Sequence, residues 1–224
     1  MRIAAMIAAS LLAAGCSHTT GDHSAPTPST PQTSTGAGAS VSKSPQASTA
    51  PTASAAISDV IGWIEAGHPA DPSRFHTATR DGAATPLGDD IALTADAAKV
   101  SCMTDAKHTA GALACLVSLT NPPPAPATAY GQWQGGWVNF DGVNLQIGLA
   151  RADPGPFIYG NGPELANGDS LSFGDYRCRA DPAGLYCVNY AHQAAVKFSP
   201  AGIEQFGCLK PAPPPDGVGT AFRC

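Results

Sequence analysis

The chain has 224 residues, a formal net charge of −5 and a hydrophobic share of 43%. Its acidic balance, without any basic cluster, argues against nucleic acid as a partner on electrostatic grounds. No apolar run approaches the ~20 residues that a membrane-spanning helix needs, so we expect no transmembrane helix.

Residues 1–15 resemble a bacterial secretory signal peptide that ends in a lipobox. Arg2 supplies positive charge, and a short apolar run follows from Ile3 to Ala14. Small residues precede Cys16, with Leu12 four positions before it. The resemblance implies cleavage before Cys16 and acylation of its sulfur and new amino group. Two or more acyl chains would anchor the protein stably to the outer face of the bacterial cytoplasmic membrane. The open alternative is an ordinary secreted protein in which Cys16 has no such role.

Residues 16–55 are expected to form a tether that begins with the lipidated cysteine. Val41 is the only large apolar residue between Ser17 and Ala55. A segment of this composition cannot bury enough apolar surface to offset its ordering entropy, so we predict disorder. Mixed Ser, Thr and Pro also resemble O-glycosylated stalks, although a bare spacer fits equally well. We expect the single folded domain over residues 56–224.

The folded domain is predicted to be mainly β (α+β), built from antiparallel hairpins with one helix near each end. Apolar residues at helical spacing from Ile57 to Ile64 predict the N-terminal helix. Ser199 is a suitable cap, and Pro200 suits a first turn, so a short C-terminal helix is predicted from there. The remainder is rich in strand and turn signals. One example is the hairpin predicted from Trp137 to Ile147 around Asp141-Gly142.

Six cysteines remain once lipidation takes Cys16, and an even number in an oxidising compartment predicts three disulfides. The strand pattern favours the pair Cys178–Cys187, across a turn at Asp181 to Gly184. A two- or four-residue loop places these cysteines opposite each other, whereas a three-residue loop turns them to opposite faces. A second hairpin favours Cys102–Cys115. The pair Cys208–Cys224 is then left to tie down the proline-rich tail.

The two cysteine hairpins also carry a resemblance to known proteins. The runs Val100–Met103 with Ala114-Cys115, and Tyr176–Cys178 with Leu185–Asn189, are similar to a cysteine-paired module of actinobacterial envelope proteins. With the tether layout and the stretches Trp63–Gly67 and Asn161–Leu165, the chain resembles a family of mycobacterial cell-envelope lipoproteins. No activity is established for that family. The resemblance implies an envelope location and disulfides, and it supplies no catalytic residues.

Catalytic and metal signals are weak. Gly168–Leu171 spells the GDSL signature of serine esterases, which makes Ser170 a candidate nucleophile, with Asp105 and His108 as partners. The order of these residues is reversed, and the α/β pattern of such enzymes is missing. A turn that enters a strand is the better interpretation. The histidines show no metal-ligand spacing, and Asp89-Asp90 lacks the spaced oxygen ligands of a calcium loop. We therefore expect no metal and no cofactor.

Three aromatic residues form the candidate ligand surface. Tyr130, Trp133 and Trp137 lie close together in the sequence, with Gly135-Gly136 between the tryptophans. Exposed, they could stack on a sugar or anchor a partner; buried, they would fill the core. The sequence therefore predicts a lipid-anchored, non-catalytic binding or accessory protein of the cell envelope. Its partner is an unidentified envelope protein or glycan. The alternatives are a glycan or lipid binder through these aromatic residues, and an esterase at Ser170.

Overall fold

The structure is a computed structural model that describes residues 49–224. It is mainly β, with antiparallel sheets, two α-helices and three disulfides, which confirms the predicted class. The signal peptide, Cys16 and most of the predicted tether lie outside the described residues. In the described part, no helix is long and apolar enough to cross a membrane.

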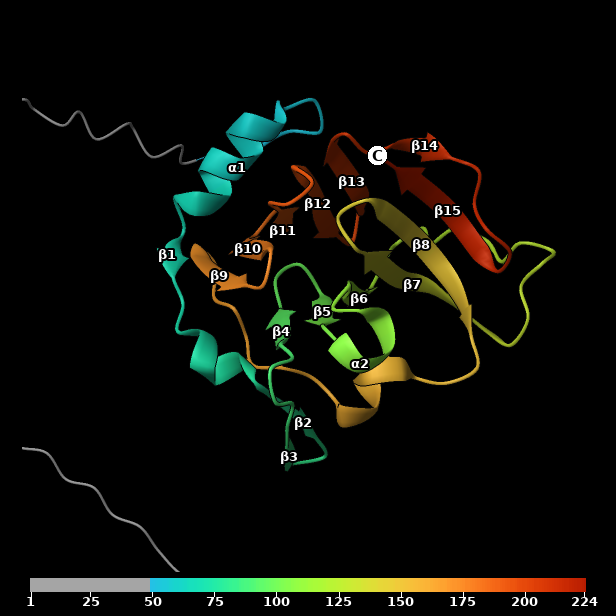
Figure 1. The fold of residues 1–224 in the computed structure, drawn as a ribbon, viewed down its shortest axis with the longest axis horizontal. Helices are drawn as coiled ribbons and strands as arrows, with labels where there is room; N and C mark the ends of the chain where they lie inside the picture. The colour runs from blue at the N-terminus through green and yellow to red at the C-terminus, as the bar shows by residue number, and fades with distance from the viewer. Residues whose placement is uncertain (1–48) are drawn as a thin grey trace, which may run out of the picture. The chain divides into compact units, whose positions relative to one another are not determined.

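Two large sheets enclose one core (Figure 1). The six-stranded sheet has the order β1-β9-β10-β11-β12-β13, with β1 parallel to β9 and the other neighbours antiparallel. Its strands are β1 (His68–Pro69), β9 (Asp169–Phe173), β10 (Tyr176–Asp181), β11 (Gly184–Asn189), β12 (Ala194–Ser199) and β13 (Gly202–Gly207).

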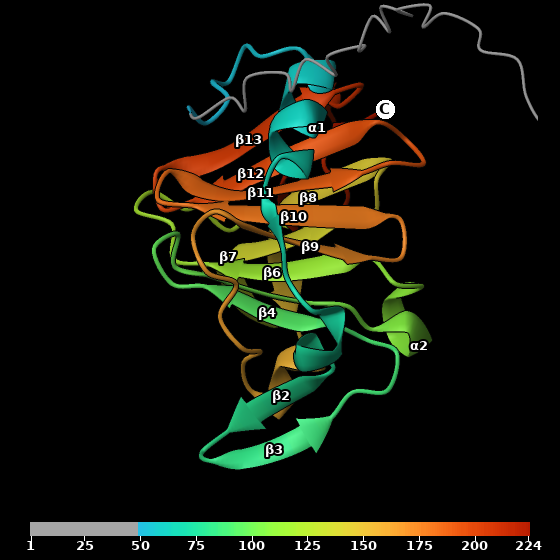
Figure 2. The same ribbon diagram turned by 90° about the vertical axis from the view of Figure 1, so that its left-hand side faces the viewer.

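The seven-stranded sheet is antiparallel, with the order β14-β15-β8-β7-β6-β5-β4. Its strands are β4 (Ala92–Ala95), β5 (Val100–Met103), β6 (Leu113–Val117), β7 (Gln132–Phe140), β8 (Asn144–Arg151), β14 (Lys210–Ala212) and β15 (Val218–Arg223). The short helix α2 (Ala106–Thr109) connects β5 to β6. A separate hairpin of β2 (Thr77–Arg80) and β3 (Ala83–Pro86) lies at one end of the fold (Figure 2). Two 3₁₀ helices complete the elements, η1 (Pro72–Phe75) and η2 (Gly155–Tyr159).

Alternation along the strands divides each sheet between the shared core and an outer face. In β11, Leu185 and Cys187 belong to the core between the sheets, while Tyr186 and Val188 pack on the opposite side. That opposite side is covered by α1 (Ile57–Glu65), which lies across β10 to β13 (Figure 2). The helix contributes Val60, Trp63 and Ile64 to this second cluster, as their helical spacing predicts.

The three disulfides join the predicted pairs, two favoured by the hairpin pattern and one left over. Cys102 is directly opposite Cys115, and Cys178 is directly opposite Cys187, each with Cα atoms 4.0 Å apart. Asp181 pairs with Gly184, so the second hairpin has the two-residue loop that such a disulfide requires. All four of these cysteines are buried in the core between the sheets. Each large sheet therefore presents one crosslinked hairpin to the other.

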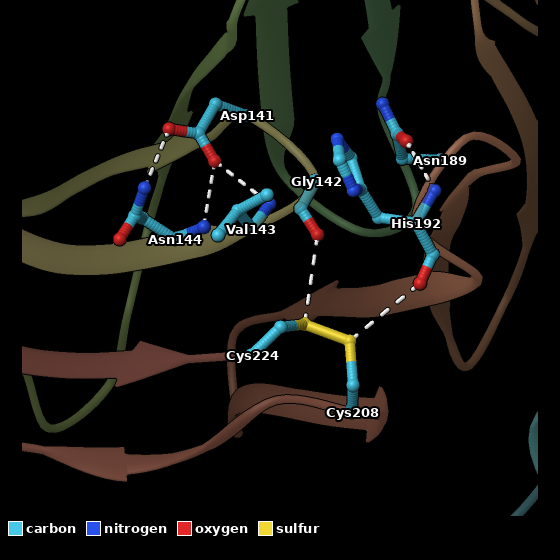
Figure 3. The surroundings of a disulfide bond; sticks show 8 residues. All are labelled: Asp141, Gly142, Val143, Asn144, Asn189, His192, Cys208 and Cys224. Atoms are coloured by element: carbon cyan, nitrogen blue, oxygen red, sulfur yellow. Dashed lines mark hydrogen bonds between the residues drawn. A yellow bond between two sulfur atoms is a disulfide. The ribbon is translucent and has the colours of Figure 1, made fainter.

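The third disulfide, Cys208–Cys224, has a different role. Cys208 follows β13 of the six-stranded sheet, and Cys224 follows β15 of the seven-stranded sheet, so this bond joins the two sheets (Figure 3). The sulfur atoms lie 3.6 Å from the carbonyl oxygen of His192 and 3.7 Å from that of Gly142. Closing a loop of this length contributes about 3 kcal/mol in the chain-entropy model.

The predicted short C-terminal helix from Ser199 is wrong. Ser199 pairs with Gly202, and residues 194–207 form the hairpin of β12 and β13. Pro200 occupies the turn, because a proline that fits the first turn of a helix fits the first central position of a β-turn equally well. The second α-helix is α2, which Asp105 caps by accepting a hydrogen bond from the backbone N–H of His108.

Two predicted boundaries also move. Ala50 and Ala55, assigned to the disordered tether, pack on the cluster beneath α1, and Pro51 O accepts a hydrogen bond from Tyr186 Oη at 3.1 Å. Apolar burial therefore orders the end of the tether.

The β7–β8 hairpin turns one residue later than predicted, because Asp141 N donates to Asn144 O and the loop is Gly142-Val143.

Candidate functional site

The outer face of the seven-stranded sheet carries a cavity of about 370 Å³, which we call the Trp137 cavity. Its floor and walls combine apolar and polar side chains from β6, β7, β8 and the segment that ends in η2. The main lining residues are Leu116, Gln132, Gln134, Trp137, Arg151 and Phe157. A volume of this size lies within the ~300–1,000 Å³ range of small-molecule sites, which pair apolar walls with a few polar groups.

A glycine irregularity positions the polar side chains of β7 toward this cavity. Gln134 pairs with Leu149, but the next pair is Val138 with Ile147, so β7 has extra residues at Gly135-Gly136. A Cβ atom on Gly136 would lie 2.1 Å from the carbonyl oxygen of Val117, so only glycine allows this close approach. The bulge brings Gln132, Gln134 and Trp137 to one cavity.

The indole of Trp137 is fixed by three contacts. Its Nε1 donates to Asn139 Oδ1 at 2.8 Å, which satisfies the buried N–H. The ring of Phe157 meets it edge-on, with centroids 5.1 Å apart and planes at 88°. The guanidinium of Arg151 lies 4.2 Å from the ring centroid, in cation–π contact. These contacts hold the indole in one orientation at the floor of the cavity.

The charged pair at the rim is Arg151 with Asp153. Arg151 Nη2 donates to Asp153 Oδ1 at 3.2 Å, and the two side chains are 25% and 70% exposed. The backbone N–H of Gly155 also donates to Asp153, and together with Arg151 it lowers the pKa of this carboxyl from its ordinary value. Asp153 is thus an ionised acceptor beside a donor-rich guanidinium.

The structure separates the three aromatic residues that the sequence grouped. Trp137 is 2% exposed and lines the cavity, whereas Tyr130 is 94% exposed on the loop that leads into Gly131 at the cavity rim. Trp133 points to the proline-rich segment instead, where its Nε1 donates to Pro123 O at 3.2 Å. The two tryptophans therefore have different neighbours on either side of the bulge at Gly135-Gly136.

The side chains that complete the cavity were missed by sequence reasoning. Gln132 and Gln134 alternate with Trp133 along β7, and that alternation of polar residues on a strand was a usable signal. Arg151 lies opposite Gln132 in the register of β7 and β8. Phe157 arrives from η2, and nothing in the local sequence shows that this segment packs over β7.

Ser170 is not arranged with a base. It lies on β9 at 2% exposure, where its Oγ accepts from Arg177 Nη2 at 2.9 Å and donates to Gly67 O at 3.3 Å. The other two members of the apparent esterase set, Asp105 and His108, bond to each other on α2 beside Arg151 and Asp153. The residues that touch the Ser170 hydroxyl hold α1 against the six-stranded sheet, since Arg177 also donates to Glu65 O.

The other singled-out polar residues have structural neighbours. Asp90 Oδ1 accepts from Thr104 Oγ1 and from the backbone N–H of Ala106, which fixes the entry to α2. His76 Nδ1 lies 3.0 Å from Asp90 O. Within residues 49–224, no group of three or more His, Cys, Asp or Glu side chains gathers as metal ligands would.

Comparison of the chain with protein-family models, with curated proteins and with solved structures gives no match in any of the three.

Proposed function

We propose that this chain is a lipid-anchored, non-catalytic binding protein of the bacterial cell envelope, and that it holds its ligand in the Trp137 cavity. The observation that carries the proposal is the cavity itself, with a fixed aromatic floor and exposed amide and charged groups at its rim. The three disulfides indicate an extracytoplasmic protein, since such bonds persist in oxidising compartments. They also make a stable scaffold for a binding site.

The anchor rests on the sequence of the first sixteen residues and on the resemblance to mycobacterial envelope lipoproteins. Acylation of Cys16 would keep the domain at the outer face of the cytoplasmic membrane, separated from it by the tether. Replacing Cys16 by alanine then releases the protein from the membrane fraction. A Cys16→Ala protein that stays in the membrane fraction would contradict the anchor and leave the binding proposal untouched.

Tryptophan fluorescence tests the site. The full chain is titrated with separate glycan, lipid and peptide fractions of a bacterial envelope, and emission is recorded. The proposal expects one fraction to shift the emission, because a ligand that contacts Arg151 and Phe157 changes the surroundings of the Trp137 indole that they cover. The shift should vanish in Trp137→Phe and persist in the matched control Trp133→Phe. A shift that survives Trp137→Phe, or no shift with any fraction, would contradict the cavity as the site.

A further inference from the structure

A second cavity adjoins the first and shares its charged rim. It measures about 360 Å³, and Arg151, Asp153 and Pro154 line both cavities. Its other walls come from α2 and from η2, including His108 and Tyr159. We call it the Tyr159 cavity. Each cavity alone is near the small end of ligand sites, so the two together suit a longer ligand that crosses the Arg151–Asp153 pair.

The charges of the Arg151–Asp153 pair, which both cavities share, are compensated within the protein. Arg151 is paired with Asp153, and His108 Nδ1 lies 2.7 Å from Asp105 Oδ2. A ligand with a net charge would meet an opposite charge that already has a partner, and a like charge beside it. A neutral ligand with many hydroxyl groups avoids that cost and can use the free donor and acceptor positions of the same side chains.

Both cavities also offer an aromatic surface. Phe157 lines the first, where Trp137 itself lies beneath Arg151 and is 2% exposed, and Tyr159, which is 46% exposed, lines the second. A pyranose ring has an apolar face of C–H groups and an equatorial belt of hydroxyls, each of which donates and accepts. The amides of Gln132 and Gln134 donate and accept as well, so they match such a belt. The apolar face matches an aromatic ring.

We infer that the ligand is a neutral oligosaccharide, with one sugar unit in the Trp137 cavity and the next in the Tyr159 cavity. This inference rests on the proposed function, because it assumes that the Trp137 cavity binds a ligand. It adds the class of the ligand, a minimum length of two sugar units, and Tyr159 as the residue that contacts the second sugar.

Calorimetric titration of the full chain, in a detergent without a sugar headgroup, tests this inference. The probes are neutral glucose, mannose and galactose oligosaccharides of one to four units, with oligogalacturonates as the charged comparison. We expect at least one neutral series to bind, with a disaccharide at least tenfold tighter than its monosaccharide. Oligogalacturonates should bind more weakly than the neutral sugars.

Three variants test the two-unit site separately from the Trp137 cavity itself. Tyr159→Ala should remove the tenfold gain and leave monosaccharide affinity unchanged, whereas Gln134→Ala should weaken both. Tyr190→Ala, in the turn after β11 of the six-stranded sheet, is the matched control and should change neither. An affinity independent of chain length, or unaffected by Tyr159→Ala, overturns the two-unit site while the Trp137 cavity stands. Failure of every neutral sugar to bind overturns the oligosaccharide, and the fluorescence titration with lipid and peptide fractions then decides the proposed function separately.

Discussion

The outer face of each large sheet carries one arginine–tryptophan pair, and the two pairs have different surroundings. On the six-stranded sheet, Arg179 stacks on Trp63 with its guanidinium carbon 3.9 Å from the ring centroid. On the seven-stranded sheet, Arg151 stacks on Trp137 at 4.2 Å. Both tryptophans are 2% exposed, but Arg179 under helix α1 is 8% exposed, whereas the side chain of Arg151 beside the short η2 is 25% exposed and lines the cavity.

The buried pair is committed to holding the helix. Arg179 Nη1 donates to Trp63 O at 2.5 Å, near the C-terminal end of α1, where a cation also complements the helix dipole. Burial lowers the pKa of Arg179 from its ordinary value, because desolvation penalises the charged form. Arg151 instead meets an exposed carboxylate at the rim of a cavity. The two pairs therefore differ in the exposure of their arginine and not in residue type: Arg179 is held under the helix, and Arg151 borders a cavity.

Loss of the helix anchor should have the largest effect. Trp63→Ala removes a large ring from the cluster that also holds Tyr186 and Val188, so we expect the free energy of unfolding to fall by about 3–5 kcal/mol. Thermal melting checks this. Ligand affinity per folded molecule should not change, and a loss of affinity at unchanged stability would reverse the roles assigned to the two faces.

The buried hairpin disulfides should come next, and the two sheets should respond alike. Replacing Cys178 and Cys187 together by alanine should lower the free energy of unfolding by about 2–4 kcal/mol, because the crosslink no longer restricts the unfolded chain. The double alanine variant at Cys102 and Cys115 should lose a similar amount, since both pairs lie in the same core. Denaturant titration of both variants checks this, and an unaffected midpoint would contradict it.

Glycine substitutions on the two faces should act in opposite directions. Gly136→Ala places a Cβ against Val117 O, so we expect a cost of about 1–3 kcal/mol and loss of the ligand-dependent emission shift. Gly62→Ala, in α1, meets no atom within 4 Å and should instead stabilise the protein by about 0.5–1 kcal/mol. Melting curves of the two variants test the pair, and a tolerated Gly136→Ala would remove the structural reason for the cavity.

Alkaline pH should loosen the covered face. Burial raises the pKa of Tyr186 to about 12, and its hydroxyl donates to Pro51 O. The folded protein then keeps the phenol proton that the unfolded chain loses near pH 10. The free energy of unfolding should therefore fall as the pH rises from about 10 to about 12. Burial raises the pKa of Tyr176 to about 12 as well, so Tyr186→Phe should reduce that fall without removing it, and an unchanged slope would show that the Tyr186 phenol does not contribute.

We expect the Ser170 hydroxyl not to react as a nucleophile. The hydroxyl is buried on β9, between β1 and β10, and bonds to Arg177 and Gly67, so a fluorophosphonate probe should leave the folded protein unlabelled. Labelling that disappears in Ser170→Ala would restore the esterase interpretation.

The local sequence pattern was enough to predict the hairpins, but it did not predict how they pack against one another. Cys178 and Cys187 could be paired because a two-residue loop and a strand register determine each other. A helix start and a β-turn could not be told apart at Ser199-Pro200, since both favour the same residues. The cavity depends on η2 packing over β7 and on a close approach of Gly136 to Val117 O, and both contacts join segments far apart in sequence. Tyr130, Trp133 and Trp137 were therefore grouped by proximity in the sequence, and only Trp137 reached the cavity.

Crosslinking in the native envelope can show which outer face of the protein meets a ligand. A photoreactive amino acid is placed at Gln134, at the rim of the Trp137 cavity, and in a parallel protein at Asp59, exposed on α1 over the other sheet. After irradiation of intact cells, mass spectrometry identifies what each position captures. The account predicts a reproducible adduct at position 134, carbohydrate in nature, and none at position 59. Capture at position 59 alone, or the same adducts at both positions, would contradict the assignment of the seven-stranded sheet's outer face as the binding face.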